Sequence, residues 1–212
     1  TPAAITANSQ KRGIAPSVII ERNGERIGIV GATTQVLAAI SSPGATTVVG
    51  GPTDNMPLLA SIIQPVVDSL VALGINKIVL LSHLQQIANE KALAPLLRNV
   101  DIIISGGNHA FTADGTDRLT PGHVATERYP IMTTNNNGQP LAILNTTSEW
   151  KYVGRFVCDF DSAGVLLPNL LDSVVNGAYV ADTAMVTSLW GTYSAAFVAG
   201  AKGANVRTLC TA

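Results

Sequence analysis

The stretch KIVLLSHLQQIANEKALAPLLRNVDIIISGGNH, residues 77–109, decides the fold class. Its two ends, Lys77–His83 and Asp101–Ser105, are short and almost entirely apolar, which is typical of strands covered on both faces. Between them, Ala88 to Arg98 carries apolar side chains at helical spacing. A strand, a helix and a second strand at this spacing form a βαβ unit with parallel strands. The sequence therefore predicts an α/β fold.

The residues before this unit predict a hairpin and a long helix. The β-branched run Ser17–Arg22 is followed by Asn23-Gly24, a strong hairpin signal, and then by a returning strand at Arg26–Gly31. Apolar residues recur at helical spacing from Leu58 to Val71. We expect Pro65 to kink or restart this helix, Gly74 to end it, and Thr46–Val49 to form a further short strand.

The residues after the unit predict a mixed sheet. A long polar loop, Gly106–Tyr129, is followed by three apolar runs that predict an antiparallel meander: Ile131–Thr134, Leu141–Leu144 and Tyr152–Phe160. We expect the tail from Pro168 onward to be helical, especially Ala181 to Gly200.

The composition excludes several classes of protein. The chain has 212 residues, of which 47% are hydrophobic and 13% charged, which argues against a disordered chain. Its net charge is −1 without a basic patch, so no nucleic acid polymer is expected as a partner. No apolar run is long enough to span a bilayer. Cys158 is interpreted as a small buried hydrophobic residue rather than as half of a bridge to Cys210.

Two of the three histidines follow neighbouring strands. His83 ends one predicted strand, and His109 lies just beyond the next. The carboxyl ends of adjacent parallel strands lie at the same edge of a sheet, where ligands bind. Two imidazoles in one cleft suit zinc or manganese. The alternative is that each is an ordinary strand-end residue, and His123 is expected to have a plain surface role.

A pair of carboxylates occurs in the polar loop, in Asp114-Gly-Thr-Asp117. The spacing suits a hard cation such as calcium, but the rest of an EF-hand loop is absent, so we interpret it as a turn. The sequence has no nucleophile elbow, P-loop or complete dinucleotide fingerprint.

Six motifs in order carry a resemblance to a known family. They are GERIGIVGATT at 24–34, SPG at 42–44, GINKIVLLSH at 74–83, VDIIISGGNH at 100–109, YP at 129–130, and KYVG at 151–154 with FDSAG at 160–164. In this order they resemble the 5′-nucleotidase branch of the calcineurin-like metallophosphoesterases, over roughly residues 17 to 165. The loop that contains Asp114 to Leu119 is also similar to a subgroup of atypical secreted bacterial alkaline phosphatases.

The resemblance implies a four-layer α/β/β/α sandwich with two divalent metal ions between its sheets. These ions, zinc, manganese or similar, would serve hydrolysis of nucleotides or other phosphomonoesters. By motif position, His83 corresponds to a ligand of the second metal. His109 corresponds to the second His of a Gly-His-x-His motif, which is a ligand of the first metal. Asn108 is assigned to substrate binding.

Two departures from the family pattern qualify this reading. The first His of the Gly-His-x-His motif falls on Gly107, and a shift by one residue would place Asn108 there instead. The family's N-terminal Asp-x-His, bridging Asp and Gly-Asn-His-Glu motifs are not in the sequence. We therefore expect residues 1–166 to be the C-terminal half of a catalytic domain, and 167–212 to be a helical linker or tail towards a further domain.

These features support more than one hypothesis about function. The first is a part of a metal-dependent phosphoesterase, periplasmic or extracellular, whose partners are a phosphate ester and the N-terminal half of the domain. On that hypothesis the isolated chain is expected to be inactive, so its status as an enzyme stays open. The second is a degenerate binding or scaffold module of the same fold. The third is an unrelated sugar- or nucleotide-binding domain.

Overall fold

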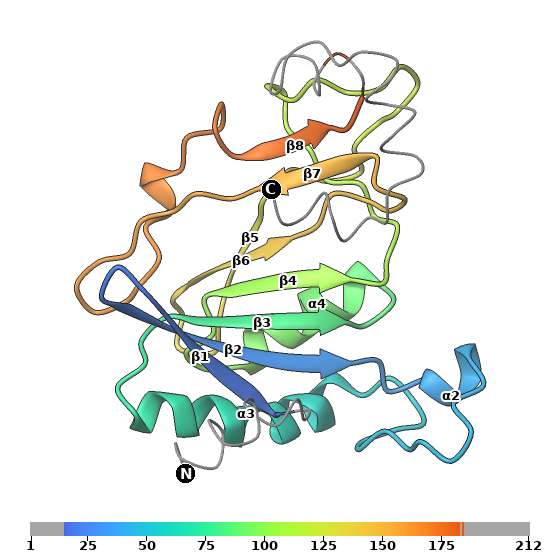
Figure 1. Cartoon of the computed structure of the whole chain (residues 1–212), viewed down its shortest axis with the longest axis vertical. Helices are drawn as coiled ribbons and strands as arrows, with labels where there is room; N and C mark the ends of the chain where they lie inside the picture. Colours follow the sequence, from blue (N-terminus) through green and yellow to red (C-terminus); the bar gives the residue numbers. More distant parts are fainter. Residues whose placement is uncertain (1–14, 183, 185–212) are drawn as a thin grey trace, which may run out of the picture.

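The computed structural model describes residues 15–182 and 184, which form two sheets and the helices around them (Figure 1). The large sheet has the strand order β1-β2-β3-β4-β6-β5, and the small sheet pairs β7 with β8. The strands are β1 (Ser17–Arg22), β2 (Glu25–Thr33), β3 (Ile78–His83), β4 (Ile102–Gly106), β5 (Ile131–Thr134), β6 (Pro140–Leu144), β7 (Tyr152–Arg155) and β8 (Gly177–Val180). The helices are α2 (Leu37–Ile40), α3 (Met56–Ala72) and α4 (Ile87–Leu93), with 3₁₀ turns η1 (Ala94–Leu96) and η2 (Pro168–Leu170).

The large sheet is mixed, which confirms the predicted α/β class. Strands β2, β3, β4 and β6 run parallel, and β1 and β5 pair antiparallel at the two edges. The β1–β2 turn has positive φ at both Asn23 and Gly24, 51° and 80°, as a two-residue hairpin turn requires. The predicted β3–α4–β4 unit is present, with its strands adjacent and parallel.

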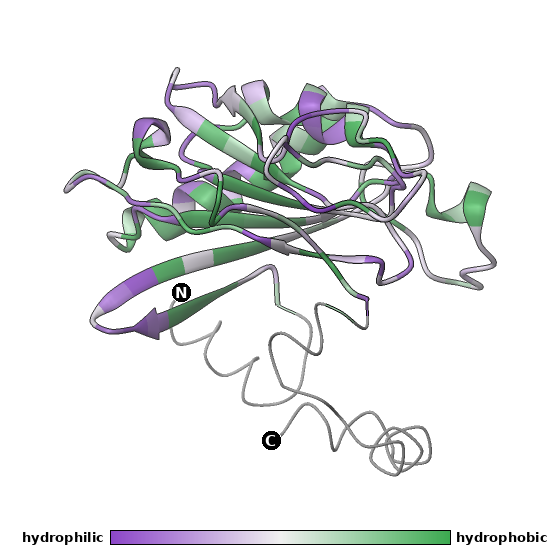
Figure 2. Cartoon of the chain, turned by 90° about the horizontal axis from the view of Figure 1, so that it is seen from above, coloured by the Kyte–Doolittle hydropathy of each residue, from purple (hydrophilic) through white to green (hydrophobic). Residues whose placement is uncertain are grey.

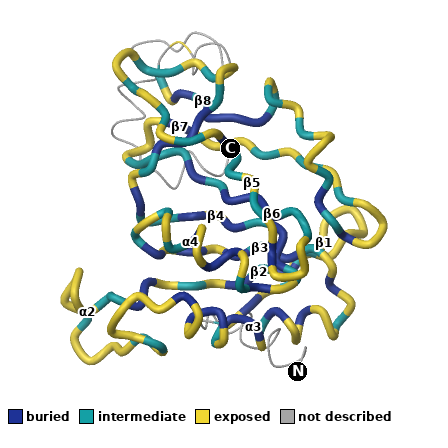
Figure 3. The backbone as a smooth tube through the Cα atoms, turned by 180° about the vertical axis from the view of Figure 1, so that it is seen from behind, coloured by how far each residue is buried: buried dark blue, intermediate teal, exposed yellow. Residues whose placement is uncertain are grey.

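Helices α3 and α4 cover one face of the large sheet. Their apolar side chains pack with those of the sheet into the main core, in which Leu70, Leu80 and Ile103 are fully buried. The packing is close enough to require a glycine at position 28, because a Cβ there would lie 2.8 Å from Leu70 Cδ1. Seen from above, the helices lie together on one side of the sheet (Figure 2). The buried backbone follows the middle strands (Figure 3).

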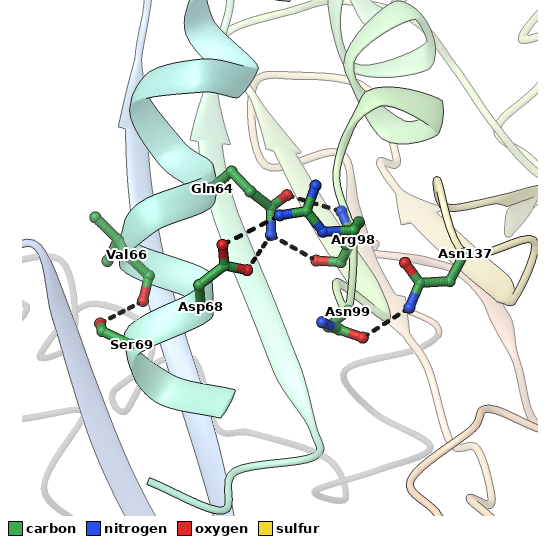
Figure 4. Close-up of polar contacts among 7 residues, drawn as sticks. All are labelled: Gln64, Val66, Asp68, Ser69, Arg98, Asn99 and Asn137. Atoms are coloured by element: carbon green, nitrogen blue, oxygen red, sulfur yellow. Dashed lines mark hydrogen bonds and ion pairs between the residues drawn. The ribbon is translucent and has the colours of Figure 1, made fainter. Parts of the chain in front are cut away.

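A polar contact joins α3 to the chain that follows η1 (Figure 4). The amide of Gln64 accepts from Arg98 N at 2.8 Å and donates to Arg98 O at 3.4 Å. Asp68 accepts from the same Gln64 amide at 2.7 Å and from the Arg98 guanidinium at 3.1 Å. These bonds satisfy backbone groups of a segment that has left regular secondary structure.

The opposite face of the large sheet is apolar and partly exposed. Side chains alternate along a strand, so the neighbours of buried Leu80 and Ile103 point away from the helices. Leu81 and Ile104, which are register partners, are 44% and 45% exposed. None of the helices described within residues 15–182 packs on this face. The described residues thus form one helical layer on one large sheet, and the four-layer sandwich stays a prediction.

A small second core lies beyond the β5–β6 side of the large sheet, at the top of Figure 1, where the polar loop meets the β7–β8 sheet. Phe111 and Tyr152 stack with ring centroids 4.6 Å apart, and both pack near His123. Asp117 ties the loop to β8 by accepting from Ala178 N at 3.0 Å. The loop that looked irregular in sequence therefore has apolar contacts of its own.

Several predicted elements differ from the observed ones. Residues Thr46–Val49 form no strand, because they lie in a turn region with Thr46 N bonded to Pro43 O. The helix predicted from Ala88 to Arg98 ends at Leu93 and continues as the 3₁₀ turn η1, which begins before Pro95. Pro65 lies within the single helix α3, so the predicted restart is wrong, and the alternative of a kink stays a prediction.

The C-terminal predictions also need correction. The run Tyr152–Phe160 is no third strand of a meander, because β7 ends at Arg155 and pairs with β8. Helix was predicted from Pro168 onward, but η2 is a single turn and β8 is a strand. Most of Ala181 to Gly200, together with Cys210, lies outside the described residues. The division at residue 166 stays a prediction, although the β7–β8 pairing crosses it.

Two predictions about burial and membranes can be compared with the structure. Cys158 is half-buried, and burial raises the pKa of its thiol to about 11, with Asp159 adding to the effect. In the part of the chain that the structure describes, every helix is too short or too polar to cross a membrane.

Candidate functional site

The carboxyl ends of β3 and β4 place the predicted site residues at one edge of the sheet. In the register of the two strands, His83 pairs with Gly106, the last residue of β4. The chain then continues through Gly107 and Asn108 to reach His109. Both histidines are exposed. The expectation that they lie at the same edge of the sheet is met, and their convergence on one metal ion stays a prediction.

The ring of His83 lies against the two glycines that follow β4. A Cβ on Gly107 would lie 2.4 Å from Cδ2 and 2.5 Å from Nε2 of His83, and 2.9 Å from Oε1 of Gln85. A Cβ on Gly106 would lie 3.5 Å from His83 Nδ1. Gly107 also has φ +77°, a conformation that L side chains rarely adopt. The imidazole of His83 therefore fills the space that a side chain at position 107 would need.

His109 is held by the loop that follows β6. Its Nδ1 lies 3.1 Å from Ser148 Oγ, and its carbonyl accepts from Thr147 Oγ1 at 3.3 Å. With Nδ1 engaged by a hydroxyl, Nε2 is the nitrogen that faces away from the protein contact. Ligating histidines in proteins are held in this way, by a hydrogen bond at the other ring nitrogen.

The loop that contacts His109 has an unusual backbone. Thr147, Glu149 and Trp150 have positive φ of 79°, 64° and 57°. Trp150 is 93% exposed. The Lys151 ammonium lies 2.8 Å from Glu149 and lowers the pKa of that carboxyl, with a smaller contribution from His109. Non-glycine residues in this region of the backbone are costly and gather at functional sites.

Asn108 is buried, and its amide is bonded to protein on both sides. Its Nδ2 donates to Ser105 Oγ at 2.7 Å. Its Oδ1 accepts from Ala110 N at 3.0 Å and from Asn145 Nδ2 at 2.9 Å. Asn145 comes directly after β6 and also donates to Ala110 O. Asn108 thus holds the turn that carries His109, and its assignment to substrate binding stays a prediction.

Glu90 of α4 lies beneath this turn and is fully buried. Its Oε1 accepts from Ser82 Oγ at 2.8 Å. Burial raises the pKa of the Glu90 carboxyl, and hydrogen bonds from Ser82, from its own amide, and from Ser105 and Leu84 partly offset this. Sequence reasoning missed Glu90, Ser105 and Asn145 as members of one network. The one sequence signal that could have pointed to Asn145 is its position directly after the apolar run Leu141–Leu144; that this run lies parallel to β4 is known from the structure.

A hollow of about 440 Å³ opens beside the same edge. It is lined by residues from β4, β6 and the loop after β6, among them Ile104, Asn145 and Thr147, and by Phe156. The hollow adjoins the loop that holds His109, because Thr147 belongs to both.

The described side chains fit a metal ion in part. His83 and His109 offer two imidazoles, a ligand type that zinc and manganese accept. A catalytic zinc ion takes three protein ligands. Within residues 15–182 and 184, no group of three or more His, Cys, Asp and Glu side chains is placed to hold a metal. These residues therefore do not complete a metal site by themselves.

The remaining sequence candidates form structural contacts. Asp114 accepts from Thr116 N at 2.8 Å and its own amide donates to Asp117 at 2.8 Å, so this segment is a turn, as interpreted. His123 is half-buried, with Nδ1 3.0 Å from the Tyr152 hydroxyl. It packs in the small core, away from the strand ends that carry His83 and His109.

Comparisons with known proteins show which proteins this chain is similar to. No protein-family model matches the chain. The 5′-nucleotidase of Mus musculus is 29% identical over 185 residues, which cover 81% of this chain and 30% of the mouse protein. The snake venom 5′-nucleotidase of Crotalus adamanteus is 26% identical, over 77% of this chain and 26% of its own length. The crystal structure of a 5′-nucleotidase precursor from Thermus thermophilus superposes with a TM-score of 0.65 at 29% identity, over 79% of this chain and 30% of that one.

The mixed α/β fold is therefore similar to part of the fold of a 5′-nucleotidase precursor. The chain is similar to part of the 5′-nucleotidases in sequence and in structure, as the resemblance seen in sequence predicts. The chain spans about 30% of the length of the first curated relatives it matches.

Proposed function

We propose that this chain carries part of the metal site of a phosphate-ester hydrolase, with His83 and His109 as ligands. The observation that carries the proposal is the β3–β4 register, which brings both histidines to one sheet edge in a relative of 5′-nucleotidases. His109 supports the role through its Nδ1 contact with Ser148, which leaves Nε2 available.

The remaining ligands come, on this proposal, from polypeptide outside these 212 residues. Two imidazoles are fewer than the three protein ligands of a catalytic zinc ion. The apolar face around Leu81 and Ile104 is suited to a second sheet, because contiguous apolar surface marks an interaction site. A partner that covers this face would reach the carboxyl ends of β3 and β4, since both strands contribute to the face and to the edge.

The substrate class we propose is a nucleotide or another phosphomonoester. The relatives are named 5′-nucleotidases, and the hollow beside the His109 loop offers space for a small substrate. The location we propose is extracellular or periplasmic, and a relative from snake venom supports it. The chain alone should not hydrolyse phosphate esters, because its site is incomplete.

A manganese titration followed by NMR tests the proposal. Paramagnetic Mn²⁺ broadens the imidazole signals of residues that bind it. Addition of Mn²⁺ to the full chain should broaden the signals of His83 and His109 first and leave those of His123, which lies in the small core, sharp. Equal broadening of all three histidines would contradict the assignment of the site. Hydrolysis of a chromogenic phosphate ester by the chain alone, lost in His83→Ala, would contradict the expected inactivity.

A non-catalytic module of the same fold is the second candidate function. Gly107 favours it, because the family's first motif His falls there and the His83 ring fills the space of any side chain at this position. Phosphatase activity of a longer protein that contains these 212 residues would exclude this candidate.

A further inference from the structure

The buried carboxylate of Glu90 is a group that the proposed ligand set does not use. It extends from α4 towards the strands and is 0% exposed. A buried carboxylate is costly unless hydrogen bonds compensate it, so its position calls for a physical reason. Its contacts lie directly behind the edge of the sheet that carries the histidines.

The first contacts of Glu90 are two serines on neighbouring strands. Ser82 and Ser105 are register partners of β3 and β4, and both are buried. Ser82 donates its hydroxyl proton to Glu90 Oε1 at 2.8 Å. Glu90 Oε2 has no partner with hydrogen-bond geometry in the described chain, and the nearby Ser105 hydroxyl lowers the pKa of the carboxyl. The carboxylate of Glu90 is therefore bonded to Ser82 on β3 and lies near Ser105 on β4, each one residue before the end of its strand.

Further hydrogen bonds continue from Ser105 to the turn that carries His109. Ser105 Oγ accepts from Asn108 Nδ2 at 2.7 Å, which leaves its own proton free to point at Glu90. Asn108 Oδ1 accepts from Asn145 and from Ala110 N, at 2.9 and 3.0 Å. The direction of each bond follows from the carboxylate, which can only accept when ionised.

We propose that Glu90 is a positioning residue of the candidate site. It holds the end of β3 in position through Ser82, and it holds the turn before His109 in position through Ser105 and Asn108. This inference rests on the proposed function for its meaning, because His83 and His109 are the ligands it would position. Its structural part can be tested without metal. Residues behind a metal ligand usually change metal affinity about 10- to 100-fold when replaced.

The test compares Glu90→Gln with Asp101→Asn in the full chain. Both replace a buried carboxylate with an amide, but Glu90 is on α4, whereas Asp101 lies just before β4, at the end away from the histidines, and accepts from Ile78 N at 2.7 Å. Imidazole NMR signals are recorded without metal. Glu90→Gln should move the signals of His109 and His83 and leave those of His123, whereas Asp101→Asn should leave all three unchanged. Unchanged signals in Glu90→Gln would overturn the proposal.

Ser105→Ala keeps the proposal testable if Glu90→Gln does not fold. This variant removes the link between Glu90 and Asn108, so the His109 signals should move as they do in Glu90→Gln. Where both variants fold, the double variant should show no larger shift than either single one, because the two residues act in series. Additive shifts would contradict this relay.

Zinc binding separates the inference from the proposed function. If wild type binds zinc, Glu90→Gln should weaken it about 10-fold or more, and Asp101→Asn should not. If wild type binds no zinc while the His109 signals still move in Glu90→Gln, the metal role fails and the positioning role stands. Zinc affinity unchanged in a folded Glu90→Gln would contradict the positioning role.

Discussion

At Gly107 the sequence departs from the 5′-nucleotidase motif that it otherwise resembles, and the space for a Cβ atom limits which residues can stand there. The ring atoms of His83 lie 2.4 and 2.5 Å from where that Cβ would be, and φ is +77°. Gly107→Ala should therefore lower the free energy of unfolding by more than about 1 kcal/mol from the backbone conformation alone. It should also displace His83, which imidazole NMR would report.

A matched glycine is available as a control for this prediction. Gly115 has open space around its Cβ position and no positive φ, so Gly115→Ala should change stability by less than about 0.5 kcal/mol. Gly107→His, which would restore the family motif, should be destabilised as Gly107→Ala is. Chemical denaturation of the three variants is the measurement. Equal stability of Gly107→Ala and Gly115→Ala would contradict the account of His83.

Asp101 makes stability depend on pH. Burial raises the pKa of its carboxyl from 3.8 to about 7, partly offset by the hydrogen bond from Ile78 N and by Lys77. Between these pH values the folded state binds more protons than the unfolded state, so stability falls as pH rises. A shift of about 3 units corresponds to about 4 kcal/mol as an upper bound.

The prediction for Asp101 is a difference between two pH profiles. From pH 4 to pH 8, the unfolding free energy of wild type should fall relative to that of Asp101→Asn, by up to about 4 kcal/mol. The asparagine oxygen can still accept from Ile78 N, so the variant should fold. The measurement is chemical denaturation at a series of pH values. If the unfolding free energies of wild type and Asp101→Asn change with pH in the same way, the pKa of the Asp101 carboxyl is not raised.

At the scale of elements, Gln64 holds α3 to the segment after η1 (Figure 4). Gln64 is 9% exposed and bonds both backbone groups of Arg98. Gln64→Ala should cost about 1–3 kcal/mol, because it leaves buried polar groups without partners. Arg98→Ala removes only the half-exposed ion pair with Asp68 and should cost less than about 1 kcal/mol. Thermal unfolding compares them, and a larger loss in Arg98→Ala would reverse our ranking.

The elements differ in how well sequence alone predicts them. Strands β3 and β4 were predictable from their nearly continuous apolar runs, helix α3 from its helical apolar spacing, and strand β1 from the β-branched residues before the hairpin signal. Strand β8 was not, because Gly177–Val180 is short and its pairing depends on distant β7 and on Asp117. The helix does not restart at Pro65 because most helical stability in proteins comes from packing of the apolar face, and Ile63 and Val67 on either side of it are buried.

Of the candidate site, the sequence predicted the exposed histidines but not the buried side chains behind them. His83 and His109 follow from strand ends in a parallel sheet, which is a topological argument. Glu90, Ser105 and Asn145 meet through the side-chain packing of three separate elements, and sequence spacing does not encode that contact. The use of Asn108 inside the protein likewise depends on Asn145, 37 residues away.

At the scale of the whole molecule, the open face of the large sheet is the main surface feature. Leu81 and Ile104 lie side by side on it. Such a surface should bind a hydrophobic dye and favour self-association. The double variant Leu81→Thr/Ile104→Thr should reduce both, since threonine keeps the β propensity of the strands.

Val153→Thr serves as the control for the open face. Val153 is 63% exposed but lies on β7, in the other sheet, so its replacement should leave dye binding near the wild-type level. Dye fluorescence and analytical ultracentrifugation are the measurements. Equal dye binding and equal self-association in the double variant and in Val153→Thr would show that the open face of the large sheet is not responsible for either.

Zinc stoichiometry of the purified 212-residue chain tests the central claim most directly. Elemental analysis after incubation with zinc would compare wild type with His83→Ala, His109→Ala and His123→Ala. Because two imidazoles form only part of a site, the account predicts weak binding, which reaches about one zinc ion per chain at excess zinc in wild type and in His123→Ala and is lost in both other variants. No zinc in wild type, or zinc that remains after both substitutions, would contradict it.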